Sequence, residues 1–404
     1  MINNENKPEI RIEGFQDTWN KHKLSEVANV YDGVHQTPKY TDSGVMFLSV
    51  ENISNLKSKK YISEEAFERD FKVYPTKGDV LMTRIGDVGT TNVVEIDDKI
   101  AFYVSLALLK PINVESYFLS NVIKSPLFKK GLKERTLTTA IPQKINKDEI
   151  GKVEVVVPDS FKEQEQIGKY FRWYDGLIEL HQREIDRLVC VRNAMIDKLF
   201  PQNGNNVPAV RFEGFDAPWI LKPFSEIFTE RHIIDTISDE YPQLSFTIEE
   251  GVIRPEDKKT NKRDFLILDK ANKKYLQTEY DDIIYNPANV IYGAIHRNAL
   301  GKGCVSPIYK IFSTDQDSMF MECIVRHPRF IKEISKSMEG TVKKLRTLKP
   351  KAFMEMSAYI APTIDEQKKI AEYFCKLDRL IEVEKEEMEK LNHIKSACTE
   401  KMFV

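Results

Sequence analysis

The chain has 404 residues, with 60 basic and 62 acidic side chains and a formal net charge of −2. This length predicts two or three domains, and a hydrophobic content of 41% excludes wholesale disorder. The five cysteines lie far apart without metal-ligand spacing, the first residues are polar, and no apolar run is long enough to cross a membrane. We therefore expect a reduced, cytoplasmic protein that holds no metal and contacts no membrane.

A short segment with aromatic residues, called the phrase below, occurs twice in the sequence. It reads "RIEGFQDTW" from Arg11 and "RFEGFDAPW" from Arg211. Each copy follows a proline and leads to a Ser-Glu pair. With these flanks, eight identities fall in register over about twenty positions, which indicates an internal repeat rather than a chance match.

The body after the first phrase, residues 20–157, has a β-rich pattern. Apolar runs such as "VMFLSV", "DVLMTRI", "AFYVSLALL" and "KVEVVV" are separated by Gly, Pro, Asn and Asp. The segment "IGDVG" (residues 85–89) is too short for a dinucleotide-binding fingerprint and predicts a turn between strands.

A long helix is predicted next, over residues 158–201. Ser160 and Glu163 have the spacing of a capping box, in which these side chains satisfy the first free backbone N–H groups. Apolar residues then recur by fours and threes as in a coiled coil. The seam positions are Ile167, Phe171, Tyr174, Ile178, His181, Ile185, Leu188, Arg192, Met195 and Leu199. The linker "PQNGNN" ends this helix.

The second half follows the same plan with a different body. Its strand-like runs include "DFLIL", "DIIY", "VIYGAI" and "CVSPIYKIF", and a second helix is predicted over residues 362–404 from a capping box at Thr363 and Glu366. Its seam is Ile370, Phe374, Leu377, Ile381, Glu384, Met388, Leu391, Lys395, Cys398 and Met402. The polar breaks match, His181 with Glu384 and Arg192 with Lys395. Antiparallel pairing would place His181 within about a turn of Glu384.

These patterns predict an α+β fold with a pseudo-twofold internal repeat. Two β-rich domains, residues 1–157 and 202–361, are separated by two long antiparallel coiled-coil helices, residues 158–201 and 362–404. Two different β-rich domains attached to matching repeats and helices suggest two versions of one binding domain with different targets.

No catalytic pattern is complete. "GAIHRNALGKG" lacks the spacing of a phosphate-binding loop, "NPAN" lacks the second proline and the aromatic ring of the adenine-methyltransferase tetrapeptide, and the seven histidines are scattered. We therefore expect the chain to be non-catalytic by itself.

Basic clusters occupy equivalent places in the two halves, within residues 124–147 and 326–351. A solvated surface would explain one such cluster, but two at matching positions favour contact with phosphates. The segments "DGVHQTPKY" (residues 32–40) and "AIHRN" (residues 294–298) are expected to be loops whose amide, imidazole and guanidinium groups can read base edges.

Over nearly its whole length the sequence resembles the specificity subunit of Type I restriction–modification systems. The resemblance rests on the paired "EGF…W" openings, "DGVHQTPKYTDSGVMFLSVENI", "GDVLMTRIGDVG", "GKGCVSPIY" and the twin "EQ…I…YF…D…I" helices. It implies two target recognition domains that each read half of a gapped site in double-stranded DNA. The helices would be a spacer and a docking surface for two modification (methyltransferase) subunits, which bring S-adenosylmethionine and methylate adenine. Restriction/translocase subunits would add ATP- and Mg²⁺-dependent translocation and cleavage, while this chain would bind no cofactor.

Candidate residues follow from these arguments. For DNA contact they are His35, Gln36, Thr37, Lys39, Tyr40, Arg84, Thr138, Gln143, Lys144, His296, Arg297, Lys302, Lys343, Lys344 and Arg346. For docking of partner subunits on the helices they are Tyr170, Phe171, Tyr373 and Phe374. Two alternatives stay open: a stand-alone DNA-binding regulator with a coiled coil, and a methyltransferase in its own right, which would bind S-adenosylmethionine as an isolated chain.

Overall fold

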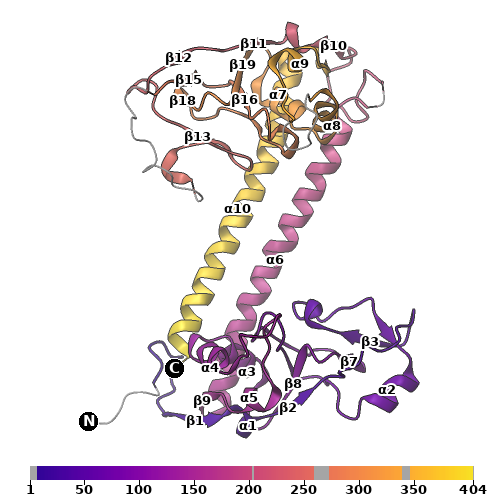
Figure 1. Cartoon of the computed structure of the whole chain (residues 1–404), viewed down its shortest axis with the longest axis vertical. Helices are drawn as coiled ribbons and strands as arrows, with labels where there is room; N and C mark the ends of the chain where they lie inside the picture. Colours follow the sequence, from indigo (N-terminus) through magenta and orange to yellow (C-terminus); the bar gives the residue numbers. More distant parts are fainter. Residues whose placement is uncertain (1–6, 203, 259–272, 339–345, 404) are drawn as a thin grey trace. The chain divides into compact units, whose positions relative to one another are not determined.

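The computed structural model describes residues 7–202, 204–258, 273–338 and 346–403. The chain forms two compact units: residues 1–184 together with 384–404, and residues 185–383. Each unit combines a β-rich body with part of both long helices, so the units are described one at a time (Figure 1).

The first unit carries small helices and short strands between the phrase and the first long helix. Its strands are β1 (Trp19–Lys23), β2 (Ala28–Asp32), β3 (Val45–Leu48), β4 (Tyr61–Ile62), β5 (Val80–Thr83), β6 (Thr91–Val93), β7 (Ile100–Phe102), β8 (Leu106–Pro111) and β9 (Glu154–Pro158). Its helices are α1 (Leu24–Val27), α2 (Glu64–Asp70), α3 (Ser116–Ile123), α4 (Pro126–Arg135), α5 (Lys147–Gly151) and the start of α6 (Phe161–Leu199), with a 3₁₀ turn at Val50–Asn52.

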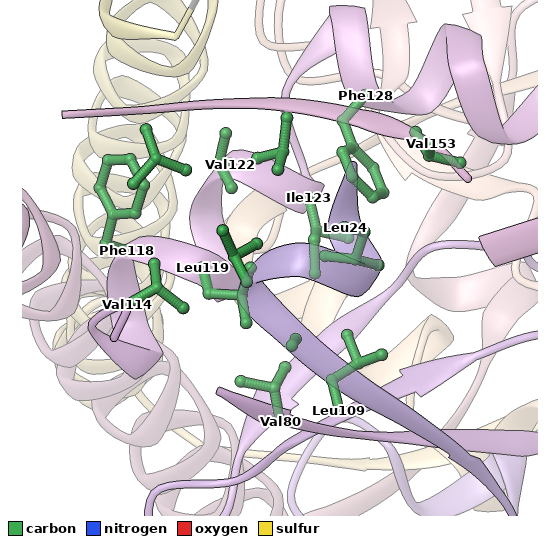
Figure 2. Packing of buried hydrophobic residues seen from close by; sticks show 14 of the residues in the cluster. Leu24, Val80, Leu109, Val114, Phe118, Leu119, Val122, Ile123, Phe128 and Val153 are labelled. Atoms are coloured by element: carbon green, nitrogen blue, oxygen red, sulfur yellow. The ribbon is translucent and has the colours of Figure 1, made fainter. Parts of the chain in front are cut away.

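The main sheet of the first unit is antiparallel, in the order β2-β8-β5-β6. A second sheet has the order β4-β3-β7, with β3 parallel to β7, and β1 pairs with β9. Side chains alternate across β5, as in any strand. Val80 and Met82 join a core with α3 and α4, whereas Leu81 faces the core formed with the second sheet. Both faces of the main sheet are therefore covered, and Figure 2 shows part of the first of these cores.

The second unit repeats this element order with a different middle. Its strands are β10 (Ile220–Pro223), β11 (Phe228–Glu230), β12 (Ile234–Asp235), β13 (Ser245–Thr247), β14 (Gly251–Ile253), β15 (Tyr275–Thr278), β16 (Ile283–Tyr285), β17 (Ile295–Arg297), β18 (Gly303–Val305), β19 (Lys310–Thr314) and β20 (Ser357–Ile360). Its helices are α7 (Ser318–Val325), α8 (Pro328–Ser337), α9 (Pro350–Met354) and the start of α10 (Ile364–Met402), with 3₁₀ turns at Phe224–Glu226, Pro255–Asp257 and Val290–Tyr292.

The main sheets of the two units share one strand order. In the second unit it is β11-β19-β16-β17, again antiparallel, and β10 pairs with β20 as β1 pairs with β9. The second sheets differ, because β12-β15-β18 is wholly antiparallel and a β13–β14 hairpin is added. The two bodies thus keep one main sheet and diverge around it.

The long helices are antiparallel, as their contacts within each unit show. In the first unit the His181 Nδ1 atom lies 2.6 Å from Glu384 Oε2, which confirms the predicted pairing, and Lys395 forms an ion pair with Asp175. In the second unit Arg192 Nε lies 2.5 Å from Asp378 Oδ1. Arg192 and Lys395 are equivalent in the repeat, and so are the two aspartates. The basic seam residues Arg192 and Lys395 therefore each pair with an aspartate, whereas His181 and Glu384 pair with each other.

The strand predictions were correct in part. "AFYVSLALL" divides into β7 and β8, and "VIYGAI" begins with a 3₁₀ turn at Val290–Tyr292 before β17. The expected turn at residues 85–89 is confirmed, since Gly86 and Gly89 have φ of +83° and +100°, which favour glycine. "DFLIL" lies outside the described residues.

Candidate nucleic-acid interface and helix junctions

The repeated phrase binds the start of the first long helix. Arg11 donates from Nε and a terminal nitrogen to the Glu163 carboxylate at 2.7 and 2.9 Å, and the Trp19 indole N–H donates to it at 3.3 Å. Glu163 is fully buried, so its charge is met inside the protein. The capping box is formed only in part: Ser160 Oγ accepts from the Glu163 backbone N–H at 3.3 Å, while the Glu163 side chain turns to Arg11 and Trp19. We name Arg11, Trp19 and Glu163 the first clasp.

A second clasp repeats these contacts in the second unit. Arg211 donates to Glu366 at 2.7 and 2.8 Å, and the Trp219 indole N–H donates to the same carboxylate at 3.2 Å. Thr363 Oγ1 accepts from the Glu366 backbone N–H at 3.3 Å. The duplicated text therefore encodes a duplicated junction between body and helix.

The glutamine after each clasp glutamate ties in two further elements. Gln164 donates to the Pro158 carbonyl, at the end of β9, and accepts from the Glu115 backbone N–H, at the start of α3, both at 2.8 Å. Gln367 makes the matching bonds to the Ala361 carbonyl and the Asp317 backbone N–H, at 2.9 and 3.0 Å. The Glu-Gln pair thus fixes each long helix against its own body.

In each unit, the phenylalanine after the C-terminal end of one long helix packs against the N-terminal part of the other long helix. In the first unit, the Phe403 ring lies 5.5 Å from Phe171 and 5.7 Å from Phe118. In the second, Phe200 lies 6.2 Å from Phe374. Phe171 and Phe374, predicted as docking residues, are 0% and 1% exposed because these contacts enclose them. Their neighbours Tyr170 and Tyr373 are half-buried and leave part of each ring at the surface.

The DNA-contact candidates of the first unit gather at one end of the main sheet. His35, Gln36, Thr37, Lys39 and Tyr40 are exposed just after β2. Arg84, at the end of β5, is 5% exposed and donates from a terminal nitrogen to Asp32. Its Nε atom is buried with no hydrogen-bond partner among the described residues, and burial lowers the pKa of the guanidinium.

The loop between α4 and α5 is attached to the same place. The Gly86 N–H donates to the Gln143 carbonyl at 2.8 Å, and the Ile145 N–H donates to the Arg84 carbonyl at 3.0 Å. Thr138, Gln143 and Lys144 are exposed on this loop. Three segments that are far apart in the sequence, 32–40, 84–89 and 137–144, therefore meet.

His296 and Arg297 lie in strand β17 and not on the loop expected for them. His296 is 3% exposed, with Nε2 2.8 Å from the Ile248 carbonyl and Nδ1 3.5 Å from Glu322. Arg297 donates to Asp281 at 2.8 Å. Burial acts to lower the pKa of Arg297, but hydrogen bonds to Tyr280 and Asp281 and the charge of Glu322 raise it overall. Pairing of β17 with β16 holds both residues, so their reading of bases stays an untested prediction that their burial disfavours.

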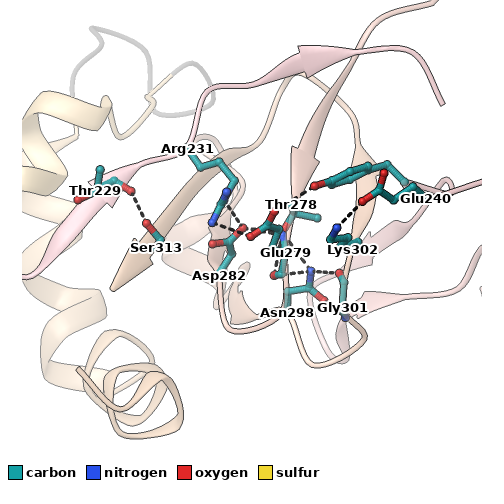
Figure 3. A network of polar contacts seen from close by, with 11 residues as sticks. Thr229, Arg231, Glu240, Thr278, Glu279, Asp282, Asn298, Gly301, Lys302 and Ser313 are labelled. Atoms are coloured by element: carbon teal, nitrogen blue, oxygen red, sulfur yellow. Dashed lines mark hydrogen bonds and ion pairs between the residues drawn. The ribbon is translucent and has the colours of Figure 1, made fainter. Parts of the chain in front are cut away.

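Lys302 belongs to a surface network of alternating charge (Figure 3). It binds Glu240, which raises its pKa, and lies 5.3 Å above the Tyr241 ring. Tyr241 donates to Glu279 at 3.0 Å, and Glu279 lies 3.3 Å from Arg231. The sequence did not indicate this network, because the joined residues lie up to about sixty positions apart. Arg346 is exposed, whereas Lys343 and Lys344 lie outside the described residues.

In the described part of the chain, no group of three or more His, Cys, Asp or Glu residues is placed to hold a metal ion. Among the same residues, none of the helices is both long and apolar enough to cross a membrane.

Known proteins share the domain and the fold. Residues 16–189 match the family model of the Type I restriction modification DNA specificity domain. The structure is similar to the crystal structure of the S subunit of a Type I restriction–modification system from M. genitalium, with a TM-score of 0.64 and 15% identity over 98% of this chain and 99% of that one. Residues 16–189 therefore carry a Type I DNA specificity domain, and the chain has the fold of that S subunit.

The matched family model is described as a DNA specificity domain. A second solved structure with this fold comes from work on complex assembly and conformational transition of the type I R-M system. Its TM-score is 0.50, with 12% identity over 94% of this chain and 96% of that one.

Proposed function

We propose that the two bodies are target recognition domains that each read one half of a bipartite, gapped site in double-stranded DNA. The observation that carries this proposal is the shared main sheet, β2-β8-β5-β6 and β11-β19-β16-β17, beside second sheets of different topology. A shared main sheet with different second sheets suits two DNA-binding domains of one kind that recognise different sequences.

The proposed readers use exposed side chains on the sheet-end loops. In the first domain these are the residues from His35 to Tyr40, with Arg84 behind them. Lys144, Lys302, Arg346 and, from the sequence, Lys343 and Lys344 are proposed to contact phosphates, which fix position without reading sequence directly.

The long helices are proposed to carry two modification subunits. Large apolar side chains stay exposed on both: Trp173 and Leu180 on α6 are each 59% exposed, and Leu380 on α10 is 50% exposed. Tyr170 and Tyr373 are proposed to add to this docking surface. S-adenosylmethionine would be bound by the modification subunits, and ATP and Mg²⁺ by restriction subunits.

Sequencing adenine methylation in a host that expresses this chain with its modification subunit tests the proposal. The expected result is one methylated motif of two specified halves and an unspecified gap of fixed length. A host with the modification subunit alone is the control and should lack the motif. A continuous motif, or methylation that does not require this chain, would contradict the proposal.

A further inference from the structure

An isoleucine stands almost free of the protein surface in the first recognition domain. Ile141 is 99% exposed, more than any other large apolar side chain in the described part of the chain, and Pro142 beside it is also exposed. Single apolar residues at a surface are common. Ile141 differs from them in its position at the tip of a hydrogen-bonded loop beside the proposed reading side chains.

The loop that carries Ile141 has a fixed base. Its two arms are joined by the Leu137 N–H, which donates to the Lys144 carbonyl at 2.8 Å. The Gly86 N–H also donates to the Gln143 carbonyl, and the Ile145 N–H donates to the Arg84 carbonyl. Ile145 itself is fully buried. The tip therefore projects from a base that is hydrogen-bonded to the end of β5, next to the proposed reading side chains.

The surroundings of the tip are basic. Exposed Lys144 lies on the loop itself, and exposed Lys129, Lys130, Lys133 and Lys147 lie on α4 and α5 at its two ends. Between Lys124 and Lys147 the sequence contains one acid, Glu134, and Asp148 and Glu149 follow Lys147 in α5. An apolar tip with basic flanks matches a ligand that has a polyanionic exterior and an apolar stacked interior, which is the chemistry of duplex DNA.

We propose that Ile141, supported by Pro142, inserts as a wedge between two adjacent base pairs of the first half-site and kinks the duplex. Isoleucine and proline are among the side chains that unstack base steps in this way. Thr138 and Gln143 then lie beside the opened step, where they can bond to base edges, and the lysines contact the flanking phosphates. This inference rests on the proposed DNA-reading function.

The test uses the complex of this chain with its modification subunits and a duplex that carries the methylated motif, labelled at both ends for energy transfer. Ile141→Ala should reduce the bend and weaken cognate binding roughly tenfold, because buried apolar area is lost. The slope of affinity against salt should stay unchanged, since no phosphate contact is removed. Ile141→Leu, which keeps the volume, should stay close to the wild type.

Ile96→Ala is the matched control. Ile96 is 39% exposed in the same domain, but its sequence neighbours Glu95, Asp97 and Asp98 are acidic, so its truncation should leave both bend and affinity unchanged. Equal bend and affinity for Ile141→Ala and wild type would overturn the wedge. So would a loss confined to assembly with modification subunits, which would assign Ile141 to a protein contact. Failure of the wild-type complex to bind the motif at all would instead reject the proposed function.

Discussion

Glu163 shows how much of each junction depends on one side chain. It is fully buried, and its carboxylate accepts from both Arg11 and Trp19. Removing one partner of a buried pair leaves the other charge uncompensated. The clasp residue is therefore more sensitive to substitution than any of the exposed ion pairs along the helices.

Glu163→Ala should lower the free energy of unfolding of the first unit by roughly 2–4 kcal/mol, since Arg11 keeps limited access to solvent. Denaturation followed by Trp19 fluorescence, with the other two tryptophans replaced by phenylalanine, measures this. Glu165→Ala is the control: that side chain is 44% exposed and 3.8 Å from Lys169, so its loss should change stability by about 0.5 kcal/mol or less. Equal effects of the two substitutions would show that the clasp is not stabilising.

His327 is predicted to make the second unit less stable in mild acid. Burial and nearby Arg329 lower its pKa, although Asp197 acts in the opposite direction. The unfolded chain then binds a proton more readily than the folded one, so stability falls as pH drops through the ordinary histidine range towards the lower folded value. The neutral ring is also needed locally, because His327 Nδ1 accepts from the Arg329 backbone N–H at 3.1 Å.

His327→Ser should reduce this pH dependence without unfolding the domain. Serine occupies the equivalent position in the first unit, where Ser125 Oγ accepts a backbone N–H at the start of α4. Urea denaturation near pH 5.5 and pH 7.5, followed by Trp219 fluorescence, measures the difference. His232→Ser, at an exposed site in the same unit, should keep the wild-type pH dependence. An unchanged dependence in His327→Ser would exclude His327 as its source.

The long helices were the elements most accurately predicted from sequence. Residues 158–201 and 362–404 were expected, and α6 and α10 span Phe161–Leu199 and Ile364–Met402. Caps and heptads are local signals, so one chain suffices to find them. The seam pair His181–Glu384 followed from the same periodicity.

Outside the coiled-coil seam, contacts between distant segments were not predictable from the sequence. The repeat revealed that Arg11 and Trp19 matter, but their partner Glu163 lies 152 and 144 positions away and already had a local explanation as a capping residue. His296 was expected on a loop, but it pairs with Ile284 of β16 and is 3% exposed. The shared strand order of the two main sheets could not be predicted, because the sequences of the two bodies have little in common.

Equal insertion in both helices should lengthen the gap of the recognised site. Seven residues in the same heptad phase, added after Leu188 in α6 and after Leu380 in α10, leave the His181–Glu384 and Arg192–Asp378 pairs in place. Each helix gains about 10 Å, or roughly three base pairs of DNA. The methylated motif reports the gap. Insertion in α6 alone is the control and should prevent methylation, and an unchanged gap with the double insertion would show that the helices do not set it.

For the whole molecule, the duplicated junctions predict that the recognition domains can be exchanged independently. Replacing residues 20–157 with the corresponding body of a Type I specificity subunit should change one half of the methylated motif and leave the other half and the gap as they were. The reason is that the first clasp and the contacts of Gln164 confine the first body to its own helix ends. Replacing residues 220–360 should change only the other half. Simultaneous change of both halves in either chimaera would contradict this independence.

The packing of Phe403 also sets an order of events during synthesis. The second unit is one continuous stretch, residues 185–383, whereas the first unit needs residues 384–404 as well. Met402 and Phe403 belong to the same core as Trp19, Phe118 and Phe171. On the ribosome, the core of the first unit therefore cannot be completed until residues 384–404 have been translated, although N-terminal domains ordinarily fold first. A chain that stops before Met402 would contain all residues of the second unit but would lack part of the core of the first unit.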